Sequence, residues 1–424
     1  MPKSFPLSSR TCGLAILLAT GLVISAQAEN WSPWRGPNQN GVAVGTDYPT
    51  HWGEDQNIRW KVKLPGWGTS TPVIWGDQVF VTGEAEQKNA LVCVNRAGDQ
   101  LWQVELGASA GNRNAKASGA NPSAVTDGKH VYAYFRNGDL ACVDLEGAVV
   151  WQVNLQEKHG ADRHWWDLGT SPVLSRDFVV VAVMHQGPSY LIALDKETGG
   201  EAWKRPRDLG APAEARDAYT TPLIVKEEGI EMLVVLGADH VTGHRVEDGE
   251  EVWRFGGLNP EARGNFRSIA SPVAAEGWIV APYARGGSLT GIRRGGAGDI
   301  SDSHQAWIAY DVAADVPSPA VYDGRVYLSR DRGEAVCLDL ETGKRRWSKR
   351  LPRSRYVYSS SPVIAGGKLY ITREDGTTFV LSLDDEPELV ATNNLRENTY
   401  ATPVFVDGKI FLRTSDYLFC IGTD

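Results

Sequence analysis

One unit recurs eight times along the chain, and this repeat constrains the fold more than any other feature of the sequence. Each copy begins with a proline that follows small or hydroxyl-bearing residues and precedes an apolar stretch. The eight prolines are Pro72, Pro122, Pro172, Pro222, Pro272, Pro319, Pro362 and Pro403, spaced by 50, 50, 50, 50, 47, 43 and 41 residues. A period of this length is typical of β-propeller blades, each of which is a four-stranded sheet.

Within a copy the order of elements is constant. The apolar strand is followed by a polar turn such as 127–129, an alternating strand such as 326–328, and a strand ending in Asp such as 191–195. A glycine turn such as 197–200 then leads to a last strand that contains a tryptophan. These tryptophans are Trp102, Trp151, Trp203, Trp253, Trp307 and Trp347, which explains much of the high content of 15 Trp and 45 Gly. Such turns and alternation predict antiparallel hairpins packed face to face.

The eighth copy ends at 419–421, before its tryptophan strand. Residues 58–64 carry the Trp-x-Val-x-Leu pattern of that missing strand. Because closure of the ring pairs edges that would otherwise stay open, we expect this N-terminal strand to complete the last blade. The predicted fold is therefore all-β: an eight-bladed β-propeller of four-stranded antiparallel blades.

The N-terminus has the pattern of a secretory signal peptide. Lys3 and Arg10 precede the apolar stretch 13–26, which is followed by Ala26-Gln27-Ala28. An apolar run this short does not suit a membrane span, and the small residues suit cleavage after Ala28. We expect a signal peptide at 1–28, a leader at 29–57 and the propeller at 58–424. A periplasmic or secreted monomer without a transmembrane anchor follows.

Charge and cysteine content narrow the class of protein further. The chain carries 43 Lys and Arg against 52 Asp and Glu, a net charge of −9, which argues against a nucleic-acid binder. Four cysteines follow the predicted cleavage site: Cys93, Cys142, Cys337 and Cys420. An even count in an exported protein leaves disulfides open, but these cysteines occupy the same position in different copies, which favours buried thiols.

The combination of Ser/Thr-Pro, Asp-Gly-x-Val-Tyr, a strand ending in Leu-Asp, Thr-Gly and Trp resembles the repeat of the pyrroloquinoline quinone (PQQ)-like propeller family. The resemblance covers residues 58 to 424. Residues 31–41 also resemble the Trp-Arg-Gly-Pro leader of many such propellers. We expect Trp34 to be wedged between blades and Arg35 to pair with a carboxylate.

The resemblance implies two alternative functions. The BamB-like branch implies an exported, non-catalytic scaffold of the cell envelope that binds a protein or ligand. The quinoprotein branch implies a dehydrogenase that oxidises alcohols or sugars with PQQ and Ca²⁺. That branch usually has an adjacent Cys-Cys pair, and this chain has none. We therefore favour the scaffold, with no cofactor, and fold alone does not license the activity.

The candidate binding residues lie in segments that a propeller presents on one face. These segments lead into each innermost strand or join the second and third strands. Arginine beside aromatic residues suits a protein partner or a small anionic ligand, although arginine–carboxylate pairs could instead tie blades together. The candidate residues are His164, Trp166, Asp167, His185, Tyr219, Arg267, Arg285, Arg330, Tyr358, Arg373 and Tyr400.

A metal site is the alternative interpretation of one part of this face. His159, His164 and His185 lie near Asp162 and Asp167 in the sequence. Their spacing is not diagnostic, and no His-Glu-x-x-His or Cys-x-x-Cys motif accompanies them. We predict neither a metal site nor catalytic residues.

Overall fold

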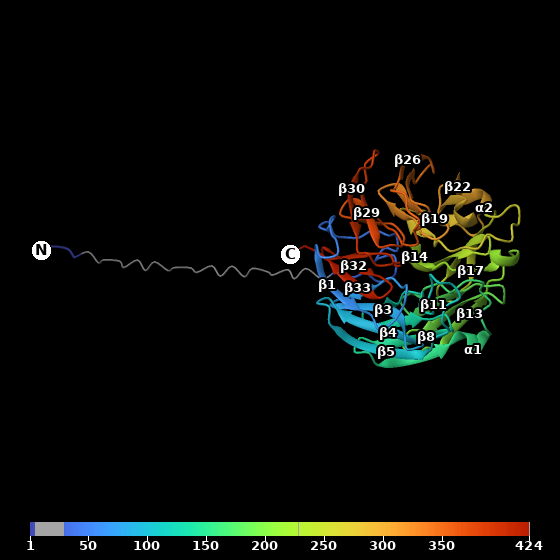
Figure 1. Ribbon diagram of the computed structural model, residues 1–424, viewed down its shortest axis with the longest axis horizontal. Helices are drawn as coiled ribbons and strands as arrows, with labels where there is room; N and C mark the ends of the chain where they lie inside the picture. Colours follow the sequence, from blue (N-terminus) through green and yellow to red (C-terminus); the bar gives the residue numbers. More distant parts are fainter. Residues whose placement is uncertain (5–28, 228, 424) are drawn as a thin grey trace.

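The computed structural model describes residues 1–4, 29–227 and 229–423, so most of the predicted signal peptide lies outside the described residues. Eight antiparallel sheets follow one another around a ring in sequence order (Figure 1). The prediction of an eight-bladed propeller is therefore confirmed. Among the described residues, no helix is both long and apolar enough to cross a membrane.

The strands of the first four blades are given from the innermost to the outermost. Blade 1 comprises β2 (Val73–Trp75), β3 (Gln78–Ala85), β4 (Lys88–Asn95) and β5 (Gln100–Ala108). Blade 2 comprises β6 (Val125–Thr126), β7 (His130–Tyr134), β8 (Asp139–Asp144) and β9 (Val149–Asn154). Blade 3 comprises β10 (Val173–Leu174), β11 (Phe178–Val183), β12 (Tyr190–Asp195) and β13 (Glu201–Pro206). Blade 4 comprises β14 (Leu223–Glu227), β15 (Ile230–Gly237), β16 (His240–Arg245) and β17 (Glu251–Phe255).

The remaining blades repeat this arrangement. Blade 5 comprises β18 (Val273–Ala275), β19 (Trp278–Tyr283), β20 (Ser288–Arg293) and β22 (Gln305–Tyr310). Blade 6 comprises β23 (Ala320–Tyr322), β24 (Arg325–Arg330), β25 (Glu334–Asp339) and β26 (Arg345–Arg350). Blade 7 comprises β27 (Val363–Ala365), β28 (Lys368–Thr372), β29 (Thr377–Ser382) and β30 (Leu389–Asn394). Blade 8 comprises β31 (Val404–Val406), β32 (Lys409–Arg413), β33 (Tyr417–Ile421) and β1 (Ile58–Lys63).

Few residues lie in other elements. The short helices are α1 (Leu155–His159), η1 (Ala213–Arg216), η2 (Ala284–Gly286) and α2 (Ser301–His304). A two-residue strand, β21 (Gly298–Asp299), belongs to the loop between β20 and β22 but pairs in parallel with β17. Blade 4 is therefore extended by a fifth strand that covers part of its outer edge.

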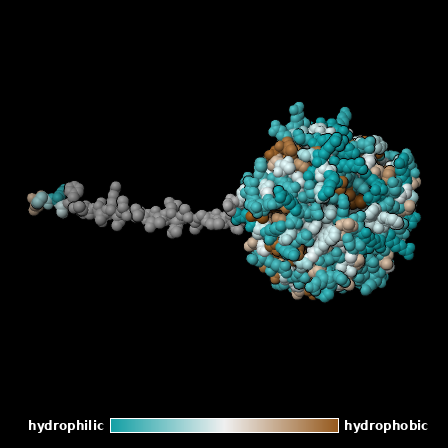
Figure 2. Space-filling view, viewed as in Figure 1, coloured by the Kyte–Doolittle hydropathy of each residue, from teal (hydrophilic) through white to brown (hydrophobic). Residues whose placement is uncertain are grey.

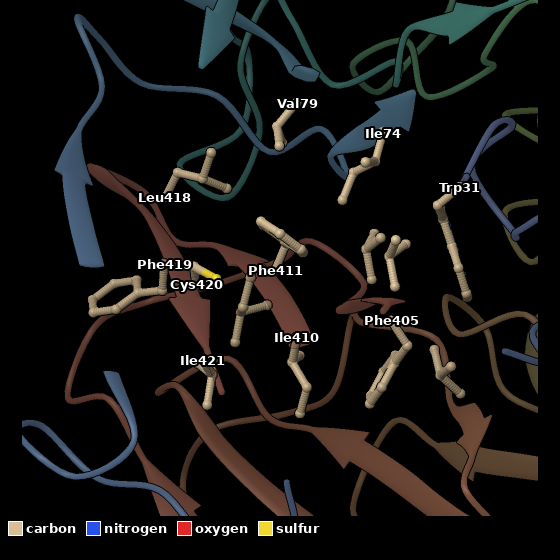
Figure 3. Close-up of a cluster of buried hydrophobic side chains, with 14 of the residues drawn as sticks. Trp31, Ile74, Val79, Phe405, Ile410, Phe411, Leu418, Phe419, Cys420 and Ile421 are labelled. Atoms are coloured by element: carbon tan, nitrogen blue, oxygen red, sulfur yellow. The ribbon is translucent and has the colours of Figure 1, made fainter. Parts of the chain in front are cut away.

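The ring is closed by β1, as the sequence predicts. This strand pairs antiparallel with β33, with Trp60 opposite Cys420 and Val62 opposite Leu418. The closing blade shares a buried cluster with blade 1 and with Trp31 of the leader; Figure 3 shows Trp31 near Ile74 and Phe405. The leader, blade 1 and the closing blade thus share one hydrophobic core.

Five of the recurrent tryptophans join their blade to the next through a hydrogen bond. The indole N–H of Trp102 donates to the carbonyl of Leu145 at 2.9 Å, and that of Trp151 donates to Lys196 at 2.8 Å. Trp60, Trp203 and Trp307 make the equivalent bond across their own interfaces. A glycine of the receiving turn lies against each ring, where a Cβ would clash. The tryptophan thus supplies both packing and a hydrogen bond.

The second copy has a different register from the one its proline suggests. The inner strand β6 begins at Val125, so Ala124, not Pro122, is equivalent to Pro72. Ser123 occupies the position of Thr71 in the hydrogen-bonding pattern. It lies 52 residues after Thr71 and 48 residues before Ser171, the equivalent residue of the third copy. Pro122 therefore precedes the equivalent position by two residues.

The four cysteines are unpaired and buried, which confirms the prediction of buried thiols. Burial raises the pKa of Cys93 and Cys337 to about 12, so these thiols are poor nucleophiles. On the side shown in Figure 2, the surface is mostly hydrophilic and hydrophobic colour is confined to small patches.

Candidate binding cavity

Eight hydroxyl residues form a closed ring around the propeller axis, one at the start of each inner strand. The backbone N–H of each donates to the hydroxyl oxygen of its neighbour at 2.8–3.2 Å, and Thr402 closes the circle by donating to Thr71. The members are Thr71, Ser123, Ser171, Thr221, Ser271, Ser318, Ser361 and Thr402. Among the described residues no acceptor takes any of their hydroxyl protons, so eight O–H groups remain available.

The leader closes the channel on the base face, which carries the turns between the third and fourth strands. Trp34 lines the cavity below the hydroxyl ring. Arg35 is 4% exposed and donates to the carbonyl oxygens of Pro319 at 2.9 Å and Pro362 at 3.1 Å. The prediction that Arg35 pairs with a carboxylate is wrong, because its acceptors are backbone carbonyl groups at the starts of two inner strands. Trp31 and Trp52, not Trp34, are the leader tryptophans buried in the core between blades.

Above the ring, a cavity of about 380 Å³ opens toward the other face, called the mouth. The connections between blades surround it. Five candidate residues from the sequence line this cavity, together with all eight hydroxyl residues: Trp166, Asp167, Tyr219, Arg267 and Tyr400. The structure therefore brings together residues separated by up to 234 positions in the chain, from 166 to 400.

Arg267 is the most unusual of these residues because it is buried with part of its guanidinium unpaired. Its side chain is 7% exposed, and Nη2 donates to Asp315 at 2.8 Å. Neither Nε nor Nη1 makes a hydrogen bond among the described residues, although Nε lies 3.7 Å from a carboxylate oxygen of Glu214. The guanidinium lies over the Trp166 ring at 5.6 Å, and the Trp166 indole donates to Glu214 at 2.9 Å. Two oriented N–H donors are thus left beside the cavity.

A loop at 109–121, called the strap, covers one side of the mouth. It joins β5 to β6, and its residues Asn114, Lys116 and Ala117 line the cavity. The backbone N–H groups of Arg113 and Asn114 donate to Asp167 at 2.9–3.0 Å. Lys116 pairs with Glu374 of blade 7 at 2.8 Å. The strap is therefore fastened at two points.

Asp167 is consequently a structural carboxylate. In addition to the two strap amides, it pairs with Arg136 at 3.1 Å, and its side chain is 1% exposed. Asp167 is the only carboxylate among the described residues that line the cavity, and its charge is already compensated. The cavity therefore offers unpaired donors but no unpaired carboxylate.

His164 and His185 lie behind the cavity wall. The His164 ring packs between His185 and Tyr219, with centroids at 5.5 and 5.1 Å. Burial opposes a charge on His164, but Asp162 and Asp217 outweigh it and raise its pKa above the ordinary value. Burial lowers the pKa of His185, whose Nδ1 accepts two backbone N–H groups.

Four candidate residues lie outside the cavity lining and brace the surrounding loops. Arg285 lies 3.8 Å from Asp315, and Arg330 pairs with Glu334 at 2.8 Å. Tyr358 is 2% exposed. Arg373 is 8% exposed and makes two hydrogen bonds with Asp375. Tyr358 and Arg373 are buried in the surrounding loops, whereas Arg285 remains exposed on the mouth face.

The sequence did not predict the strap, the pairing of Lys116 with Glu374 or the position of Trp34 at the floor of the cavity. The strap contains small and polar residues with no motif, and Lys116 meets a residue 258 positions away. The hydroxyl ring had a signal, because a hydroxyl residue precedes seven of the repeat prolines. For the described residues, no group of three or more His, Cys, Asp or Glu side chains could hold a metal ion.

The fold and its axial cavity define an eight-bladed propeller of the PQQ-like class. A sequence model of the family described as outer membrane protein assembly factor BamB matches residues 18–209 and 164–387. Together these ranges cover most of the chain, so the chain belongs to this family. The resemblance stated from the repeat motifs is confirmed.

A curated relative agrees with this assignment, and two solved structures share the fold. The outer membrane protein assembly factor BamB of Moranella endobia (strain PCIT) is 21% identical over 355 residues, 81% of this chain and 82% of the relative. The crystal structure of BamB from Moraxella catarrhalis has a TM-score of 0.62 at 16% identity and covers 86% of this chain and 97% of that one. A europium-containing methanol dehydrogenase has a TM-score of 0.72 at 10% identity and covers 93% and 98%. At these identities the structural likeness shows the fold alone.

Proposed function

We propose that this protein is an exported, non-catalytic scaffold of the cell envelope that binds a protein partner or small ligand at its mouth face. Its membership of the BamB family supports the scaffold class. The signal-peptide pattern at 1–28 supports export to the periplasm or beyond. The group received by the mouth is anionic, either a carboxylate of the partner or that of a small organic acid.

One observation carries this proposal: Arg267 is more than nine-tenths buried, lines the cavity and has two N–H donors that make no hydrogen bond among the described residues, with Glu214 3.7 Å from one of them. Leaving buried donors unpaired costs about 1–3 kcal/mol each, and acceptor oxygens of an anionic ligand would pair with them. The unpaired protons of the hydroxyl ring add further donors. Trp166 and Tyr219 supply aromatic walls on which a planar or apolar part of the ligand could pack.

The quinoprotein alternative requires PQQ with Ca²⁺, and the residues of this cavity do not fit the metal. Calcium binds six to eight oxygen ligands, usually including carboxylates. Asp167 is the single carboxylate among the described lining residues, and its oxygens already accept two backbone N–H groups and pair with Arg136. The cysteines are buried in the blades. No reaction step is derived for this cavity.

The test compares Arg267→Gln with Arg176→Gln, a control that removes an exposed arginine from a turn on the base face. The glutamine introduced by Arg267→Gln retains an amide donor for Asp315 but lacks the guanidinium. Tagged proteins of equal thermal stability are recovered from envelope extracts, and bound proteins and small molecules are identified by mass spectrometry. We expect a component recovered with the wild type and with Arg176→Gln to fall about tenfold with Arg267→Gln. Equal recovery with both variants would contradict the proposal.

Reconstitution of the protein with PQQ and Ca²⁺ distinguishes the dehydrogenase alternative from the scaffold. Protein incubated with PQQ and Ca²⁺ is assayed for reduction of a dye with alcohols and sugars. We expect no turnover and no thermal shift. Dye reduction that depends on both additives would replace the scaffold with the dehydrogenase.

A further inference from the structure

A basic run lies on the rim of blade 6, outside the cavity. Residues 345–355 contain six Arg or Lys and no acidic residue, although the whole chain has a net charge of −9. Four arginines at the mouth end of this blade are exposed. They are Arg332, Arg350, Arg353 and Arg355, here called the blade 6 patch.

The topology places these four residues together. Arg350 is the last residue of β26 and is opposite Glu334 of β25, two residues after Arg332. The loop that follows β26 is tied to the loop containing Arg332, because Leu351 donates to Gly333 and Tyr358 donates to Asp331, both at 3.0 Å. Arg353 and Arg355 lie between these two ties. The patch therefore consists of two adjacent loops and one strand end.

No carboxylate neutralises this patch. For the described residues, none of the four arginines has an acidic partner; Arg355 donates to the phenol of Tyr356 at 3.0 Å. Nearby acids are already engaged, because Asp331 accepts two backbone N–H groups and Glu334 pairs with Arg330. Four arginines on blades 3 to 5 contrast with this patch, since they pair with nearby acids: Arg176, Arg245, Arg254 and Arg263.

The loop bearing Arg353 and Arg355 is held in place from three further directions. Arg373 donates to the carbonyl of Pro352 at 3.2 Å, and Glu374 donates its backbone N–H to Val357 at 3.1 Å. The buried Tyr358 side chain packs with Phe379 at a centroid distance of 6.4 Å. A braced loop presents its cations with little conformational entropy left to lose on binding.

We propose that the blade 6 patch binds an acidic segment, rich in Asp or Glu, of a partner protein. Exposed guanidinium groups suit carboxylates through bidentate hydrogen bonds, and unpaired charge on both sides favours association. A membrane surface is a poorer match, because no large apolar side chain among residues 323–388 is exposed to enter lipid. This surface is separate from the cavity and does not require Arg267.

The test measures the affinity of a fluorescein-labelled peptide with six consecutive Glu residues by anisotropy in low salt; a six-Gln peptide is the reference. Two variants each remove four positive charges. The patch variant carries Gln at 332, 350, 353 and 355, and the control carries Gln at 176, 245, 254 and 263. We expect the wild type to prefer the Glu peptide, the patch variant to bind it about tenfold more weakly and the control to change less than about twofold.

Three results would overturn the proposal. The first is equal binding of the Glu and Gln peptides by the wild type. The second is equal weakening by the two variants, which would indicate the overall charge of the molecule rather than this patch. The third is patch-dependent binding to phosphatidylglycerol vesicles without binding to the Glu peptide, which would assign the surface to lipid. Because the peptide assay does not involve Arg267, its failure is distinguishable from failure of the proposed function.

Discussion

The two faces of the ring treat their polar groups differently. At the base, Arg35 is buried and both terminal nitrogens donate to carbonyl oxygens. At the mouth, Arg267 is similarly buried, but its Nε and Nη1 make no hydrogen bond among the described residues. Other buried mouth atoms are also unpaired, including Thr170 Oγ1 and Ser360 Oγ. At the base Arg96 Nε and Trp347 Nε1 also lack acceptors, but more of the unpaired buried atoms among the described residues lie at the mouth.

This difference indicates where stability and binding are located. Buried polar groups in a native protein are normally paired, so a concentration of unpaired donors at one face points to a ligand or partner there. At the base, the leader and the tryptophan contacts fill the space that a ligand would need. Substitutions at the base should therefore affect stability most, and substitutions at the mouth should affect binding most.

The largest expected effect is on a tryptophan that joins two blades. Trp151→Ala should lower the free energy of unfolding by about 3–5 kcal/mol, because the residue is 9% exposed and its removal leaves a cavity. The mouth control Trp165→Ala, 67% exposed, should change it by less than about 0.5 kcal/mol. Urea unfolding followed by circular dichroism measures both. Similar decreases in the free energy of unfolding for the two variants would contradict the proposed difference between the faces.

Arg35 and Arg267 provide the next contrast. Arg35→Ala should cost about 2–4 kcal/mol, because it leaves the carbonyl oxygens of Pro319 and Pro362 buried without a donor. Arg267→Gln should cost about 1 kcal/mol or less, because an amide donor for Asp315 remains. The same unfolding measurement applies. A more severe loss for Arg267→Gln would show that the mouth arginine is chiefly structural.

The interior of blade 4 adds a pH dependence that the mouth does not share. His244 Nε2 lies 2.9 Å from the Thr242 hydroxyl, which accepts from Arg207, so the histidine is held neutral. Burial lowers its pKa to about 4. Between pH 6.5 and 4 the unfolded chain binds a proton that the folded chain does not, so stability falls as pH falls.

This group should remove about 2 kcal/mol of stability by pH 5 relative to pH 7. Unfolding experiments at both pH values should show a smaller pH dependence for His244→Gln than for the wild type. His51→Gln, at an exposed position of the leader, is the control and should retain the wild-type dependence. An unchanged dependence for His244→Gln would contradict the neutral assignment.

The smallest expected effect separates the two contributions of the tryptophans. Trp151→Phe removes the indole bond to Lys196, whereas Trp347→Phe removes an indole whose nitrogen has no acceptor among the described residues. The first should cost about 1 kcal/mol more than the second. The neighbouring turn explains the difference: blade 7 has Asp384, Asp385 and Glu386 where other blades have a glycine turn. Equal losses would assign the effect of the tryptophans to packing alone.

The ring could be predicted well from the sequence because the same pattern of strands, turns and packing tryptophans occurs in successive copies of the repeat. Trp60 even indicated the closing strand. The register of the second blade was less accessible, since Pro122 and Ser123 offer two alignments that only the hydroxyl ring resolves. Local patterns could therefore fix the blades but not every alignment between them.

The mouth could be predicted only in part, because its residues come from loops that are distant in the sequence. The expected propeller topology placed Trp166, Tyr219 and Arg267 on the same face. It could not distinguish residues that line the cavity from residues that brace the loops, such as Tyr358. The contact between Lys116 and Glu374 joins distant loops and leaves no local signal. The basic run at 345–355 was also overlooked, because the net charge of the whole chain is negative and does not reveal a local cluster of positive charge.

The most direct test of the account uses two photo-crosslinking residues of matched exposure, one on each face. Position 165 at the mouth and position 44 in the leader at the base are 67% and 68% exposed in the natural chain. Each is introduced with and without Arg267→Gln, and crosslinked products from intact cells are identified by mass spectrometry. We predict a specific product from position 165 that Arg267→Gln abolishes, and none from position 44. A specific product from position 44, with none from position 165, would contradict it.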